Sequence, residues 1–156
     1  MTWEALDQGA LESLAARIAR VLRPGDVVVL AGEVGAGKTT FVRAAAAALG
    51  VQERVTSPTY QLARGYEGTT DGGRRIAVNH LDLYRLEGLE DRDALELDDY
   101  LDRRAVTFIE WAEPALGHLA EPTVVRLEHE TPETRRLSVE GPVAERIDKD
   151  EERRPC

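Results

Sequence analysis

The sequence predicts an α/β fold, in which a mostly parallel central sheet has antiparallel strands at its edges and lies between helices as a three-layer sandwich. Two continuous apolar segments, 27–31 and 105–109, predict parallel strands, because strands buried on both faces lack apolar–polar alternation. Residues 39–49 predict a helix that follows the first of these strands and ends before Gly50, a residue suited to the left-handed position after a helix. Alternating strands and helices favour a parallel sheet.

The remaining elements are predicted from spacing and turn residues. Helical spacing of leucine, isoleucine and valine predicts a first helix from residue 7 to about residue 22, and the turn residues 23–26 lead into the strand at 27–31. Four further strands are predicted beside turn-rich stretches. They lie at 60–66 and 75–81, around the turn 68–73, and at 123–128 and 135–140, around the turn 131–134.

The composition predicts one main domain. At 156 residues and 42% hydrophobic content, the chain has enough apolar material for a core. It contains no apolar stretch of membrane-spanning length and no secretory leader, so no membrane partner is expected. The single cysteine, Cys156, has no partner for a disulfide, which favours the cytoplasm. Residues 144–156 are nearly all charged and are predicted to form a disordered tail after a domain at 1–143.

The negative charge is concentrated in one segment. The chain has a net charge of −9, and residues 87–102 contain eight acids and one arginine. This segment predicts a helix with Leu97, Tyr100 and Leu101 on its buried side. Its acidic side is interpreted either as a solvated face or as a docking surface for a basic partner. A strong basic groove is not evident, which disfavours direct binding of RNA or DNA.

Residues 32–39 read G-E-V-G-A-G-K-T, a complete phosphate-loop motif between a predicted strand and a predicted helix. Lys38 is one of only two lysines among the 20 basic residues, and its compact ammonium can reach between two phosphates where a guanidinium would not fit. The motif predicts that backbone amides hold the β-phosphate, that Lys38 bridges the β- and γ-phosphates, and that the Thr39 hydroxyl binds Mg²⁺. Residues 1–143 are therefore expected to form a P-loop NTPase domain. The expected nucleotide-binding residues are Val34, Gly35, Ala36, Gly37, Lys38, Thr39, Thr40 and Thr59.

Two acids are candidates for the metal and for catalysis beside Lys38. Glu110 ends a strand that is otherwise apolar, and a buried carboxylate without a partner costs several kcal/mol, so a metal or water partner is expected. Asp82 follows another apolar-rich strand, as a Walker-B acid does, although a turn or helix-capping role remains an alternative. Thr59 lies in a Ser-Pro-Thr loop that is interpreted either as a switch loop or as an ordinary proline turn. His80 is interpreted as a structural residue.

Four blocks of the sequence together resemble the bacterial TsaE (YjeE) family. They are residues 32–40, 57–60, 80–86 and 109–111, which read G-E-V-G-A-G-K-T-T, S-P-T-Y, H-L-D-L-Y-R-L and I-E-W. The resemblance extends from about residue 7 to residue 140, and the last two blocks are more specific than the phosphate loop. One departure is Ala112, where the family usually has proline after Ile-Glu-Trp.

The resemblance implies an ATPase subunit of the machinery that makes N6-threonylcarbamoyladenosine in tRNA. It implies that Thr39 and Glu110 ligate Mg²⁺, that Asp82 is a Walker-B-like acid nearby, and that residues 57–59 form a switch-like loop. The family hydrolyses ATP slowly alone and docks onto a heterodimer of two sugar-kinase-fold proteins, TsaB and TsaD. Contact with tRNA is therefore expected only through that complex.

Two other enzyme classes compete with an accessory ATPase. A small-molecule kinase on the same fold remains an alternative, with residues 72–75 imagined as a lid over phosphates. A regulatory GTPase is strongly disfavoured, because the chain's only asparagine, Asn79, precedes a histidine and cannot form an Asn-Lys-x-Asp element. No motif identifies the residues that contact adenine, although Arg135 or Arg136 of the last hairpin could supply such a contact.

Overall fold

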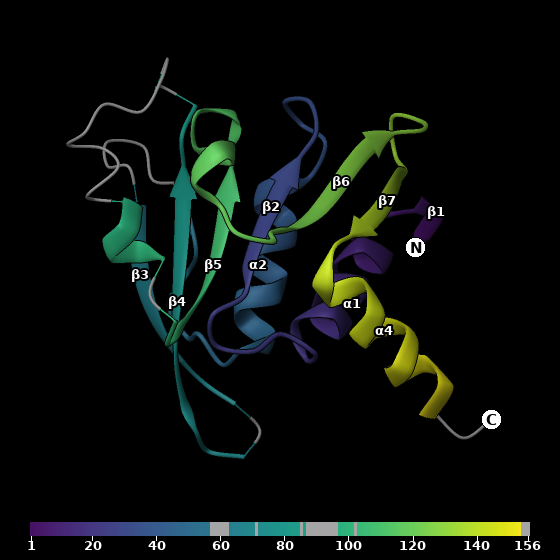
Figure 1. Cartoon of the computed structure of the whole chain (residues 1–156). Helices are drawn as coiled ribbons and strands as arrows, with labels where there is room; N and C mark the ends of the chain where they lie inside the picture. The colour runs from purple at the N-terminus through teal and green to yellow at the C-terminus, as the bar shows by residue number, and fades with distance from the viewer. Residues whose placement is uncertain (57–62, 71, 85, 87–96, 102, 154–156) are drawn as a thin grey trace.

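The computed structural model describes residues 1–56, 63–70, 72–84, 86, 97–101 and 103–153. Among these residues, seven strands form one sheet in the order β1-β7-β6-β2-β5-β4-β3 (Figure 1). The strands are β1 Thr2–Leu6, β2 Val27–Ala31, β3 Ala63–Thr69, β4 Arg75–Asp82, β5 Ala105–Glu110, β6 Thr123–His129 and β7 Arg135–Glu140. The helices are α1 Gln8–Ala19, α2 Lys38–Ala48, the 3-10 helix η1 Glu113–His118 and α4 Pro142–Arg153.

The centre of the sheet is parallel and its edges are antiparallel, which confirms the predicted architecture. Strand β2 pairs in parallel with β5 and β6, and β5 pairs in parallel with β4. Antiparallel pairing joins β3 to β4, β7 to β6, and β1 to β7. The carboxyl ends of the four parallel strands therefore lie at one edge of the sheet, where ligands of such folds bind.

Strand β1 was not predicted from the sequence. It pairs with β7 through Thr2 and Trp3, and its register shifts before Leu6, near Ala5, whose φ is 54°. Only Leu6 of the strand is buried. Because a short edge strand with one buried residue has no clear period, its position depends on the partner strand rather than on its own pattern.

Helices cover the sheet unequally on its two faces. Helices α1 and α2 pack on one face with the larger apolar cluster, which includes Phe41, Phe108 and Leu127, and they lie behind the sheet in Figure 1. On the other face, a smaller cluster joins Leu81 and Ile109 to Leu97, Ala112 and Ala115. Residues 97–100 are helical, and Leu97 is fully buried, as predicted. The rest of the acidic segment, 87–96 and 102, lies outside the described residues.

The boundaries of α1 and α2 have local causes. The Asp7 carboxylate accepts a hydrogen bond from the Ala10 backbone N–H at 2.8 Å, which caps the start of α1. Helix α2 ends before Gly50, whose φ of 82° is readily adopted only by glycine. A Cβ on Gly50 would also lie 2.0 Å from the Thr69 carbonyl oxygen, so this residue allows the end of α2 to approach β3 closely. The predicted end of this helix is therefore confirmed.

The prediction of a disordered tail is wrong for residues 144–153, which belong to helix α4. Two apolar residues one turn apart, Val143 and Ile147, are buried against the core cluster of α1 and α2. Between them, the Arg146 guanidinium pairs with both oxygens of Asp26 at 2.6 and 2.8 Å and also donates to the Val21 carbonyl oxygen. The high charge of the segment concealed this narrow apolar stripe. Residues 154–156 lie outside the described part of the chain.

We expect Arg146→Ala to destabilise the fold by about 3 kcal/mol, because it leaves a mostly buried Asp26 carboxylate without its partner. The side chains of Arg146 and Asp26 are only 20% and 14% exposed. Urea unfolding would measure the loss as a lower midpoint at an unchanged slope. Arg153→Ala, an exposed change in the last turn of the same helix, is the control and should stay within about 0.5 kcal/mol of wild type. Equal effects of the two variants would contradict this account.

Candidate active site

The phosphate loop connects β2 to α2 at the carboxyl edge of the sheet. Gly37 precedes the helix with a φ of 106°, a conformation that favours glycine. The first backbone hydrogen bond into the helix runs from Phe41 N–H to the Gly37 carbonyl oxygen at 2.9 Å. Amides in the first turn of a helix point out of its start, and they are an anion-binding feature of such helix starts.

Lys38 lies across the mouth of this loop. Its ammonium donates to the Gly32 carbonyl oxygen and to the Glu33 carbonyl oxygen, the latter at 3.1 Å, and it lies 3.9 Å from the centre of the Trp111 ring. Lys38 is only 6% exposed. Burial lowers its pKa, and the nearby carboxylates of Glu110, Asp82 and Glu113 act in the opposite direction. The lysine therefore lies close to both acids that the sequence singled out.

Glu110 ends β5 and contacts the first turn of α2. The Thr39 hydroxyl donates to the Glu110 carboxylate, with distances of 3.1 Å to Oε1 and 3.2 Å to Oε2. Oε2 also lies 2.6 Å from Nε2 of His80 on β4. Glu110 is 3% exposed and His80 is fully buried. The structure thus brings Thr39 and Glu110 together and adds a contact with His80 that the sequence did not predict.

Asp82 is the neighbour of Glu110 in the sheet, because the two residues are register partners of β4 and β5. Its Oδ1 accepts a hydrogen bond from the Tyr84 backbone N–H at 3.0 Å, the turn contact that the sequence left open as an alternative. Burial raises the pKa of Asp82, and the negative charge of Glu110 adds to the increase. Asp82 therefore stabilises a turn through Tyr84 and also lies beside Glu110, the other carboxylate of the site.

An aromatic pair lies near the loop, with Trp111 against Lys38 and Tyr84 against Trp111. Trp111 directly follows Glu110 and has a φ of 55°, which is rare for a bulky residue. Its ring meets the Tyr84 ring edge-on, with 5.0 Å between their centres. The next residue, Ala112, has a φ of −75°, a value that a proline ring also adopts. The backbone at Ala112 therefore has the φ value that a proline would also have at this position.

The other residues expected to bind the nucleotide differ in their surroundings. Val34 is 76% exposed at the tip of the loop, Ala36 is buried, and Thr40 is partly buried in the first turn of α2. Gly35 adopts a φ of 79° beside them. Thr59 and its switch-like loop lie outside the described residues, so the expectation for Thr59 stays a prediction.

Arg135 and Arg136 point to different surroundings. Arg135 donates from Nη2 to the Gly35 carbonyl oxygen of the phosphate loop at 3.3 Å. Arg136 instead forms ion pairs with acids of β1 and of the β6–β7 hairpin, namely Glu4, Glu128 and Glu130. Of the two arginines, only Arg135 is therefore placed at the phosphate loop. The sequence offered no signal that separates them beyond their alternation along one strand.

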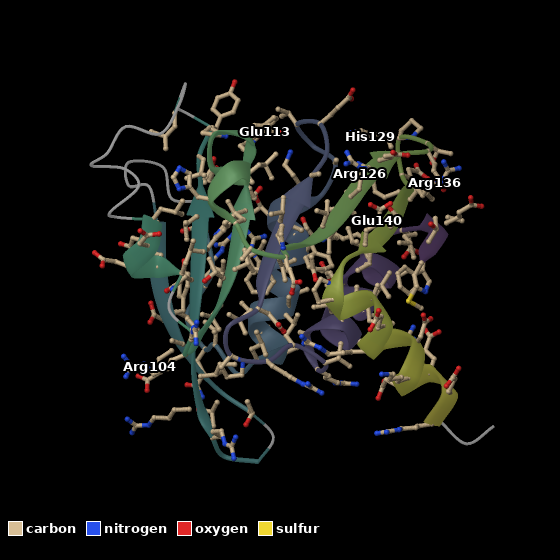
Figure 2. All side chains as sticks on the ribbon, viewed as in Figure 1. Arg104, Glu113, Arg126, His129, Arg136 and Glu140 are labelled. Carbon is tan, nitrogen blue, oxygen red and sulfur yellow. The ribbon has the colours of Figure 1, made fainter. Side chains whose placement is uncertain are left out.

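A cleft of about 660 Å³ opens beside the loop. Its lining includes Glu33 and Val34 of the loop, Trp111, and the end of β6. Figure 2 shows Glu113, Arg126 and His129 near this carboxyl edge, whereas Arg104 lies at the opposite edge of the sheet. Arg126, His129 and Glu113 all line the cleft, so both signs of charge border it.

The oxygen donors beside Lys38 fit magnesium. Mg²⁺ prefers oxygen ligands and is usually held by one or two carboxylates together with phosphates and water. The Thr39 hydroxyl and the Glu110 carboxylate lie in contact, with Asp82 on the adjacent strand. No cluster of three or more His, Cys, Asp or Glu side chains suited to a metal occurs in the described part of the chain.

Comparison with known proteins identifies the family. The sequence model described as "Threonylcarbamoyl adenosine biosynthesis protein TsaE" matches residues 6–137. The "tRNA threonylcarbamoyladenosine biosynthesis protein TsaE" of Streptomyces coelicolor is 42% identical over 71% of this chain and 73% of its own length. The protein of the same name from Treponema pallidum is 41% identical over 69% of this chain and 75% of its own length.

A solved structure supports the fold. The crystal structure of YdiB from Bacillus subtilis superposes with a TM-score of 0.73 over 97% of this chain and 95% of its own, at 23% identity. No helix among the residues described is both long and apolar enough to cross a membrane. With its P-loop NTPase fold and with sequence relatives across most of its length, the chain belongs to the TsaE family, whose members take part in the biosynthesis of threonylcarbamoyladenosine in tRNA.

Proposed function

We propose that the chain is a magnesium-dependent ATPase that supports tRNA threonylcarbamoyladenosine formation by binding a TsaB–TsaD heterodimer and hydrolysing ATP to drive its cycle. The observation that carries this proposal is the contact between Thr39 and Glu110 beside Lys38. This contact joins a hydroxyl at the start of α2 to a carboxylate at the end of β5, beside the phosphate loop. Cytoplasmic localisation, expected from the single cysteine, belongs to the same proposal.

Each residue of the site has a distinct role in the proposal. The backbone amides at the start of α2 and the Lys38 ammonium hold the β- and γ-phosphates. Thr39, Glu110 and Asp82 would hold the magnesium ion, which neutralises charge on the phosphate oxygens. In this proposal Glu110 also orients water for attack on the γ-phosphate, and its position at the end of a buried strand beside the loop supports that role. Arg135 would lie beside the loop on the side of the last hairpin.

Exposed apolar side chains support partner binding at this edge. Among the residues that the structure describes, the large apolar side chains that remain exposed are Val34, Tyr84 and Leu116, at 76%, 64% and 48%. Val34 belongs to the phosphate loop, Tyr84 contacts Trp111, and Leu116 belongs to η1 after β5. We propose that these side chains belong to the surface that the partner covers, because exposed apolar side chains are common on partner-binding surfaces.

The hydrolysis proposal is tested by phosphate release. Purified chain with Mg-ATP should release phosphate slowly, and addition of TsaB and TsaD should change the rate. The same reactions without magnesium should release phosphate at the rate of the buffer alone. Rapid ATP-dependent phosphorylation of a small metabolite by the chain alone would overturn the proposal in favour of a small-molecule kinase.

The acidic segment provides a test of partner binding. Asp98 and Asp99 are exposed on the short helix at 97–100. If this face docks a basic partner, reversing both to lysine should weaken binding of TsaB–TsaD roughly tenfold or more, because opposed charges become like charges. Binding would be measured by titration with the purified heterodimer. The matched control reverses Glu140 and Glu145, which are exposed on β7 and α4. Equal weakening by both double variants would contradict a docking role for Asp98 and Asp99.

A further inference from the structure

His80 is the buried partner of the central carboxylate. Its Nε2 lies 2.6 Å from Oε2 of Glu110, and the two side chains are 0% and 4% exposed. This distance is short for a hydrogen bond between nitrogen and oxygen, so the two side chains are in direct polar contact. A histidine that merely filled space in the core would not require a carboxylate at this distance.

The strand register places His80 directly behind the site. Side chains at alternate positions of a strand share one face, so Ile76, Val78, His80 and Asp82 all face α2. On β5, Val106, Phe108 and Glu110 face the same side, and His80 is the register partner of Phe108. Both strands are therefore apolar toward their amino ends and polar toward their carboxyl ends on this face. On this face of β4, His80 is the side chain that comes before Asp82, the register partner of Glu110. It therefore lies between the apolar core and the phosphate loop.

The second ring nitrogen indicates the tautomer. Nδ1 of His80 is buried and has no hydrogen-bond partner among the residues described. A proton on Nδ1 would leave a buried N–H donor without an acceptor, which costs more than an unused lone pair. We assign the proton to Nε2, which donates a hydrogen bond to Oε2 of Glu110. In this tautomer the ring donates from Nε2, and Oε2 of Glu110 accepts that hydrogen bond.

We propose that His80 is a positioning residue that orients the Glu110 carboxylate toward Thr39 and toward the magnesium ion of the proposed ATPase. By engaging Oε2 from the core side, His80 restricts rotation of the carboxylate, so that its remaining lone pairs face the loop. Hydrogen bonds of this kind behind a metal ligand typically change metal affinity about 10–100-fold when they are lost. This inference rests on the proposed function, because it assigns a role toward the same metal.

The experiment measures magnesium dependence of ATP binding rather than turnover. ATP affinity would be titrated at a series of Mg²⁺ concentrations and with EDTA. We expect His80→Leu to raise the Mg²⁺ concentration for the half-maximal effect about 10–100-fold, while affinity in EDTA stays unchanged. His80→Gln, whose amide keeps a donor near the position of Nε2, should restore most of the wild-type Mg²⁺ response.

Two controls separate positioning from a general structural effect. Thr107→Val removes the buried hydroxyl that donates to the Tyr100 carbonyl oxygen at 3.0 Å on the opposite face of β5, and it should leave the Mg²⁺ response unchanged. In a Glu110→Gln background, His80→Leu should cause no further change in the Mg²⁺ response, because the effect of His80 passes through Glu110. If the leucine variant does not fold, His80→Asn takes its place, since its shorter amide falls short of Oε2.

The outcomes distinguish this inference from the proposed function. If wild-type protein binds ATP with no dependence on Mg²⁺, both the proposed function and the inference are overturned. If wild-type protein shows the dependence but folded His80→Leu keeps it, or binds Mg²⁺ more tightly, the inference alone is overturned. Loss of the Mg²⁺ response in His80→Leu with recovery in His80→Gln supports it.

Discussion

Lys38→Ala is expected to lower ATP affinity about 100-fold or more. The ammonium supplies charge-assisted hydrogen bonds to phosphates in the proposed complex, each worth about 1.5–3 kcal/mol, and two such bonds exceed the 2.7 kcal/mol that corresponds to 100-fold in affinity. Burial strengthens the effect, since Lys38 is only 6% exposed at the mouth of the loop. Equilibrium titration with a fluorescent ATP analogue would measure the loss.

Two further lysine variants serve as controls for this prediction. Lys149→Ala removes the chain's other lysine, which is exposed on α4, and should leave ATP affinity unchanged. Lys38→Arg keeps the charge but replaces a compact ammonium with a planar fork, so it should recover little of the lost affinity. Wild-type affinity in Lys38→Ala would show that the phosphate loop is not the nucleotide site.

Glu110→Ala is expected to lower the rate of ATP hydrolysis about 100-fold or more while some ATP binding remains. The carboxylate contacts Thr39 and is proposed to serve both the metal and the attacking water, and loss of such a group typically costs 10²–10⁴-fold in rate. Lys38 and the backbone amides still hold the phosphates, so affinity should fall less than turnover. Single-turnover phosphate release, measured beside equilibrium ATP binding, separates the two effects.

Glu110→Gln provides the matched comparison for the alanine variant. Glutamine keeps the volume and can still accept from Thr39, but it lacks the negative charge that attracts magnesium. It should therefore lose turnover nearly as strongly as alanine while disturbing the fold less. Thermal unfolding of both variants would check the fold, because Glu110→Ala also leaves His80 without its partner. Full hydrolysis by Glu110→Ala would remove Glu110 from the mechanism.

Much of the fold followed from local sequence patterns. The strands β2 and β5 are continuous apolar segments, and the loop between β2 and α2 is specified by eight consecutive residues. Such signals are strong because burial on both faces and phosphate binding each require particular residue types at fixed spacing. Lys38, Thr39 and Glu110 could therefore be placed near one another from the order of elements alone, since parallel strands end at one edge.

The features that escaped prediction depend on contacts distant in sequence. The edge strand β1 is positioned by β7, which lies near the other end of the chain, and α4 is anchored by Asp26 through Arg146. The His80–Glu110 contact joins residues 30 positions apart. A signal for it was present, because polar residues replace apolar ones at alternate positions near the end of β4. Without the register of β4 against β5, that pattern could not identify the partner.

In the proposed function, ATP hydrolysis at this site drives repeated cycles of the modification complex. The most direct test of this claim counts threonylcarbamoyladenosine residues formed on tRNA per TsaB–TsaD heterodimer in a reconstituted reaction, with wild-type chain or with Glu110→Ala. We predict many modified tRNA molecules per heterodimer with wild-type chain, and on the order of one with Glu110→Ala, because that variant binds ATP without turning it over. An equal yield with the two proteins would contradict the claim.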